Sequence, residues 1–177
     1  YSAMGLMHNI AFRYDSSAFY YEKGEVLMKT SPKRILALDG AYSFFVNQGT
    51  MQAEFRDFEK SNEYFQKAHL LPKSATRTND ELVQNGLGNN FIEANKPKEA
   101  IGYYEKAFNE SINPYNKAKY AYNESRAFHK LGQINEFEKY ISKASKLYKE
   151  VTKKYKSWRD IYLEQNLLLS SGDLLFQ

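Results

Sequence analysis

The stretch ELVQNGLGNNFIEANKPKEAIGYYEKA, residues 81–107, decides the fold that this sequence predicts. Its first half contains Gly88 and its second half contains Ala107, and small residues let two helices approach closely. Lys96-Pro97 lies between the halves, and proline is tolerated in the first turn of a new helix. The stretch therefore predicts two antiparallel helices that are joined by a short turn and touch at the small residues.

The same spacing of small residues recurs along the chain. The first-helix sites are Gly5, Gly49, Gly88 and Ser125, and the matching second-helix sites are Gly24, Ala68, Ala107 and Ala144. Each first-helix site precedes its partner by 19 residues, whereas the step from one pair to the next varies. Helix pairs of fixed register that are joined by variable connectors are typical of helical repeat proteins. No strand is expected.

The stretch resembles the tetratricopeptide (TPR) repeat, a helix pair of about 34 residues. The residues that carry the resemblance are Leu87, Gly88, Phe91, Ala100, Tyr104 and Ala107. The resemblance implies an all-α, right-handed superhelix of antiparallel helix pairs, with about four repeats and a partial fifth. We expect one domain over 1–177, with repeats at about 1–29, 32–72, 75–110 and 114–152 and the partial fifth at 155–177.

Both ends of the chain are predicted to lie inside a repeat. Tyr1 comes only four residues before the first glycine site, and residues 171–175 (SGDLL) resemble the turn of a fifth helix pair. We therefore expect a fragment of a longer protein, and the alternative is a complete small protein whose terminal repeats have diverged.

Local signals predict several helix boundaries and core residues. Asn113-Pro114 is typical of a helix start, and Gly132 of a helix end. A helix that ends near residue 29 is expected to bury Tyr21 and Leu27. The candidate core residues near the C-terminal end are Trp158, Ile161 and Leu168.

Composition narrows the function classes. The net charge of +4, from 25 basic and 21 acidic residues, does not predict nucleic-acid binding. Without cysteine the chain has no disulfides and no thiolate metal site; a cytoplasmic location is favoured, with a periplasmic one as the alternative. No stretch approaches the roughly 18 apolar residues of a membrane span.

No catalytic motif is present. His8, His69 and His129 are isolated, and the sequence contains no H-E-x-x-H, P-loop or G-x-S-x-G pattern. We therefore expect no enzyme activity in this segment, no cofactor and no metal site. Lysines at 143, 146, 149, 153 and 156 form a basic stripe, for which a solvated helix face is favoured over a site for phosphates or acidic partners.

The candidate binding surface is the face of each first helix that does not touch its partner. In the TPR family this face lines the concave groove, and here it repeatedly carries asparagine. An amide offers both a donor and an acceptor to an extended peptide, and basic residues can hold a carboxylate. The predicted groove residues are Asn47, Asn85, Asn89, Lys119, Tyr122, Asn123, Arg126, Arg159 and Asn166. The alternative is a neutral polar face.

One known TPR binding pattern is only partly matched. TPR domains that hold the C-terminal carboxylates of chaperones use a lysine and an asparagine, then an asparagine, then a lysine and an arginine. The corresponding positions here hold Asn85 and Asn89, then Asn123, then Arg159 and Leu163. Asparagine replaces the first lysine and leucine replaces the arginine, so this carboxylate clamp is not predicted.

The asparagine-rich face is similar to that of TPR domains in bacterial regulators, including receptors for short signalling peptides and sensors that precede a kinase or DNA-binding module. The resemblance implies a peptide- or protein-binding scaffold that senses a ligand or docks a partner in such a regulator. The alternative is a structural or self-associating array, a homodimer for example, that uses aromatic residues such as Phe19, Tyr20 and Tyr103. An enzyme whose active site lies outside this segment is the third alternative.

Overall fold

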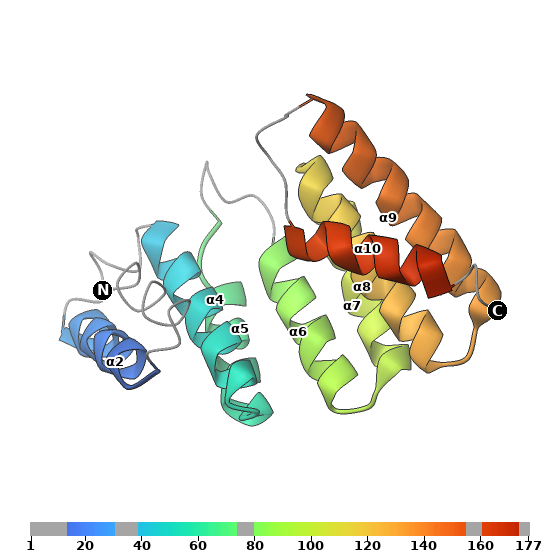
Figure 1. Ribbon diagram of the computed structural model, residues 1–177. Coiled ribbons are helices and arrows are strands. Elements are labelled where there is room, and N and C mark those ends of the chain that lie inside the picture. Colours follow the sequence, from blue (N-terminus) through green and yellow to red (C-terminus); the bar gives the residue numbers. More distant parts are fainter. Residues whose placement is uncertain (1–13, 31–38, 74–79, 155–160, 174–177) are drawn as a thin grey trace. The chain divides into compact units, whose positions relative to one another are not determined.

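The protein is all-α in a computed structural model, which describes residues 14–30, 39–73, 80–154 and 161–173 (Figure 1). The helices in these ranges are α2 (Tyr14–Thr30), α4 (Asp39–Glu54), α5 (Phe58–His69), α6 (Glu81–Glu93), α7 (Pro97–Glu110), α8 (Pro114–Lys130), α9 (Ile134–Lys154) and α10 (Ile161–Asp173). No strand occurs among them, which confirms the predicted class. None of these helices has both the length and the apolar character needed to cross a bilayer.

The chain divides into two compact units, residues 1–86 and 87–177, with the boundary inside α6. Each unit is described by itself. The first predicted helix, with its site Gly5, lies outside the described residues.

In the first unit, α4 and α5 form a tight pair. A Cβ atom at Gly49 would lie 2.7 Å from the Phe65 ring, so only glycine allows this approach. Ser61 Oγ on α5 donates a hydrogen bond of 2.7 Å to the Gly49 carbonyl oxygen, which ties the two backbones together. Ala68, the predicted partner site, is fully buried. The two helices therefore approach closely at Gly49, with the Phe65 ring against the glycine, and a direct contact between Gly49 and Ala68 stays a prediction.

Helix α2 packs on α4 through one face. Tyr21 and Met28 are buried with Phe44, and Gly24 leaves room for the Phe44 ring. The prediction that Leu27 is buried is wrong, because it is 43% exposed. Each residue turns the helix by about 100°, so the stripe that includes Tyr21 continues at position 28 rather than 27.

In the second unit, α6 and α7 repeat the contact seen between α4 and α5. A Cβ atom at Gly88 would lie 2.6 Å from Tyr104, and Ala107 is fully buried. The turn ends at Lys96, and Pro97 is the first residue of α7, as predicted. The ring of Phe91 stacks on Tyr103 with centroids 5.1 Å apart.

The following pair, α8 and α9, is bounded by the predicted signals. The Asn113 side chain accepts a hydrogen bond of 2.9 Å from the Tyr115 N–H at the start of α8. Gly132 has a φ of +69°, a left-handed conformation that glycine adopts readily, and it follows the end of α8. Ser125 and Ala144, the predicted small sites of this pair, are fully buried.

Helix α10 adds Leu163 and Leu167 to a core that it shares with α8 and α9. The prediction of Leu168 as a core residue is wrong, since it is 66% exposed. Leu163 and Leu167 are one helical turn apart and define the buried face, and residue 168 points away from it. Trp158 and the side chain of Ile161 lie outside the described residues.

Candidate functional site

A polar cluster in the second unit joins three helices. The Tyr104 hydroxyl of α7 donates a hydrogen bond of 2.8 Å to Asn89 Oδ1 of α6. Arg126 of α8 is close enough for its charge to act on this hydroxyl. Asn89 and Arg126 are half-buried, whereas Tyr104 is fully buried.

The electrostatics of the cluster keep the Tyr104 hydroxyl protonated. Burial raises its pKa well above the usual value of 10, because a phenolate would lose its hydration. The positive charge of Arg126 opposes this rise, and the negative charge of Glu93 adds to it. The hydroxyl therefore remains a hydrogen-bond donor at any physiological pH.

This geometry fixes the direction of the Asn89 amide. Its oxygen is occupied by Tyr104, so the NH2 group lies on the other branch of the amide. The Arg126 guanidinium carries only donors. The cluster thus presents donors to an incoming group, and it is suited to a carbonyl or carboxylate oxygen.

Three more predicted groove residues lie on α8. Lys119 is exposed, Tyr122 is half-buried, and Asn123 is only 5% exposed. The Tyr122 carbonyl oxygen accepts a 2.6 Å hydrogen bond from Ser125 Oγ. A side chain as buried as Asn123 serves the packing of its own unit first and offers little surface to a ligand.

The remaining predicted groove residues are spread over other elements. In the first unit, Asn47 of α4 is half-buried and Asn85 of α6 is 8% exposed. Asn166 of α10 is half-buried, and Arg159 lies outside the described residues. Asn47, Asn85, Asn123 and Asn166 each interact with other groups of the chain. The asparagines therefore do not form a uniform row of open amides.

Sequence reasoning missed a buried carboxyl group on α8. Glu124 is 1% exposed, and burial raises its pKa to about 7. The Tyr140 hydroxyl of α9 bonds to this carboxyl group, and the charges of Lys143 and Lys139 also favour its ionised form, while Glu105 opposes it. The other oxygen, Oε1, has no hydrogen-bond partner within the described residues.

A comparison of repeat positions could have revealed this glutamate. Glu124 directly precedes the small site Ser125, and the residue that precedes Gly88 in the same register is Leu87. The equivalent residue in the α4–α5 pair is Gln48, which is 3% exposed. A polar residue at this position is therefore enclosed by the fold.

A second cluster that sequence reasoning missed lies in the first unit. Asp80 is buried just before α6, and its Oδ2 lies 2.8 Å from His69 Nδ1 and 2.5 Å from Lys73 Nζ. This ion-pair group ties the chain that follows α5 to the start of α6. Nowhere in the described ranges do three or more histidines and carboxylates gather as metal ligands would.

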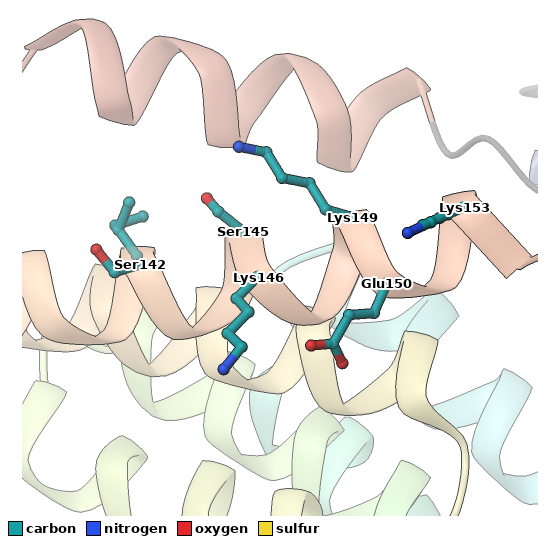
Figure 2. A pocket seen from close by; sticks show the side chains of 7 residues that line it. Ser142, Ser145, Lys146, Lys149, Glu150 and Lys153 are labelled. Carbon is teal, nitrogen blue, oxygen red and sulfur yellow. The ribbon is translucent and has the colours of Figure 1, made fainter.

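Two hollows lie along α9. The larger, of about 610 Å3, is drawn in Figure 2, and all of its lining residues within the described ranges belong to α9. Its lining residues are Ile141, Ser142, Ser145, Lys146, Lys149, Glu150 and Lys153. The smaller, of about 270 Å3, is lined by α9 together with Glu164, Leu167 and Leu168 of α10. The predicted lysine stripe thus borders a real depression.

Of the predicted stripe, the lysines at 143, 146, 149 and 153 lie on α9, and Lys156 lies outside the described residues. Comparisons of the chain with protein-family models and with curated proteins find no match.

Proposed function

We propose that this chain is a TPR-like superhelix of antiparallel helix pairs that binds an extended peptide or partner segment. The fold proposal is supported by a repeated contact. In both α4–α5 and α6–α7 a glycine faces an aromatic ring that comes 16 residues later, Phe65 after Gly49 and Tyr104 after Gly88. The same position in α8–α9 holds the buried Ile141, 16 residues after Ser125. A shared register in three helix pairs is the signature of a repeat array.

The binding proposal rests on one observation, the hydrogen bond between Tyr104 and Asn89 beside the charge of Arg126. A side chain that is already fixed loses little further entropy when it binds a ligand, so its hydrogen bonds contribute more to affinity. Asn89 and Arg126 are the members of the predicted groove set that best fit this role. They occupy equivalent positions, one residue after Gly88 and one residue after Ser125.

In this proposal the chain is the sensing or docking segment of a bacterial regulator. A peptide that bridges Asn89 on α6 and Arg126 on α8 contacts two successive first helices. It therefore favours one angle between neighbouring helix pairs over others, and a change in superhelix curvature follows from that preference. Neither end of such an array has to touch the ligand to respond to it.

The test uses peptides selected from a random library displayed on phage, with their affinities measured by calorimetry. Replacing Asn89 and Arg126 together by alanine should weaken binding at least about tenfold, since charged hydrogen bonds are lost. Lys106→Ala is the matched control, because Lys106 is an exposed cation of the same unit that lies over the Tyr103 ring. Equal affinities of the double variant and the parent protein would refute the proposed site.

A structural, self-associating array is the second candidate, favoured by exposed apolar residues on α2. Phe19 and Val26 are both 52% exposed and are seven residues apart on one helical face. Replacing both by serine should remove any concentration-dependent dimer in sedimentation experiments. Ile112→Ser is the control, because Ile112 is 90% exposed but isolated in a loop. A monomer at all concentrations would exclude this candidate.

A further inference from the structure

The depression along α9 has a charge pattern of its own. Lys146, Lys149 and Lys153 line the larger hollow, and Glu150 is the single acid among the lining residues that the structure describes. In Figure 2 Lys149 and Ser145 extend toward α10, while Lys146 and Glu150 extend from the opposite side of α9. A segment lying over α9 would therefore have lysines on both flanks.

The depression also has an apolar border. The two hollows share Ser145 and Lys149, so they form one continuous surface across α9 and α10, which we name the α9–α10 groove. Leu168 lines its α10 side and is 66% exposed, and the neighbouring Leu169 is 68% exposed. Exposed apolar surface that is rimmed by polar residues is typical of protein contact sites, and Leu168 supplies such surface beside Lys149.

We propose that the α9–α10 groove binds an acidic amphipathic helix of a partner protein. Carboxylates of that helix pair with Lys146, Lys149 and Lys153, and its apolar stripe covers Leu168. Lys149 and Lys153 are one helical turn apart and Lys146 extends from the other side of α9, so acidic residues on both edges of a helix laid over α9 can reach a lysine. Helix α9 has 21 residues and is about 30 Å long, so it offers enough length for a partner of several turns.

A helix is favoured over a nucleic acid by the composition of the groove. A phosphate backbone has no apolar surface to cover the exposed Leu168 on the α10 side of the groove, whereas the apolar stripe of an amphipathic helix does. This proposal is independent of the peptide site at Asn89 and Arg126, because none of those residues lines the groove.

The test uses two labelled synthetic helices of about 18 residues, about 27 Å long. They share one leucine stripe, and they carry either glutamate or lysine at the same flanking positions. Fluorescence anisotropy should detect binding of the acidic peptide to the parent protein, weakened by added salt through charge screening. The basic peptide should not bind.

The decisive experiment reverses the charge of the lysines in the groove. The triple variant Lys146→Glu, Lys149→Glu and Lys153→Glu should lose about tenfold or more in affinity for the acidic peptide and gain affinity for the basic one. The control variant Lys96→Glu, Lys98→Glu and Lys130→Glu has the same net charge and alters exposed lysines elsewhere. It should bind the acidic peptide as the parent does. Circular dichroism confirms that both variants are folded.

Leu168→Ser tests the apolar half of the contact. It should lower the affinity for the acidic peptide severalfold, and it should not create binding of the basic peptide. If the control variant loses as much affinity for the acidic peptide as the groove variant, the binding is a general attraction between opposite charges and the proposal is overturned. So would tighter binding of a single-stranded oligonucleotide through the same lysines. The absence of any binding to the parent protein would overturn it as well.

Discussion

The helix pairs α6–α7 and α8–α9 have the same register of small residues but place their polar groups differently. In α6–α7 the residue before the small site is Leu87, and the only polar atom of Tyr104 reaches the half-buried Asn89. In α8–α9 the residue before the small site is Glu124, a carboxyl group enclosed by the pair. The register thus determines how the helices pack, and single residues beside it determine where charge is buried.

The largest expected effect concerns the shared register. Gly88→Leu should destabilise the fold by about 3 kcal/mol or more, because its Cβ atom alone would lie 2.6 Å from the buried Tyr104 ring. Gly102→Leu on α7 is the matched control, since nothing lies within 4 Å of a Cβ atom there. That change should be neutral or stabilise by about 0.5–1 kcal/mol through helix propensity. Similar losses for both variants in chemical denaturation would contradict the assigned contact.

The next effect is a pH dependence of stability that is expected from Glu124 in α8–α9, for which α6–α7 has Leu87 at the same position. The pKa of Glu124 is raised to about 7 in the folded protein from a usual 4.5, so the folded state holds a proton that the unfolded state releases between these values. The stability gained from this proton is fully present below about pH 4.5 and is lost as pH rises through 7. Over that range the loss amounts to at most about 3 kcal/mol.

Glu124→Gln should remove this part of the pH dependence, so the variant should exceed the parent in stability at pH 8 and approach it at pH 5. Urea denaturation across this range measures the difference. Glu138→Gln, an exposed change on α9, should leave the profile unaltered. A parent protein whose stability stays constant or rises between pH 5 and pH 8 would show that Glu124 is ionised in the folded state.

Local chemistry explains which parts of the fold were predictable. The helix starts at Pro97 and Pro114 and the end at Gly132 depend on a residue's own backbone limits, so the sequence alone predicts them. The buried faces of α2 and α10 are less certain in sequence, because apolar residues are adjacent there. Leu167 and Leu168 are equally apolar, and only the neighbouring helix decides which of them is covered.

The spacing of small residues predicts equivalent positions for Asn89 and Arg126, but it does not predict the hydrogen bond that Asn89 accepts from Tyr104. Counting one residue on from each small site places Asn89 and Arg126 on one surface. The hydrogen bond of Tyr104 depends on how closely α6 and α7 approach. The spacing of residues within one helix does not predict that distance. The burial of Asn85 and Asn123 likewise depends on what packs against their helices, so a repeated residue type did not give a repeated exposure.

The smallest expected effect on stability concerns the hydrogen bond between the Tyr104 hydroxyl and Asn89 in α6–α7. Tyr104→Phe keeps the ring against Gly88 and removes only the hydroxyl that bonds Asn89, so it should destabilise by about 1 kcal/mol. Tyr103→Phe removes a hydroxyl from a half-buried ring stacked on Phe91 and should change stability by less than about 0.5 kcal/mol. If Tyr104 fixes the Asn89 amide, Tyr104→Phe also lowers the affinity for a peptide selected from the phage library severalfold, whereas Tyr103→Phe does not. A loss of stability with unchanged affinity would show instead that the bond serves the helix contact alone.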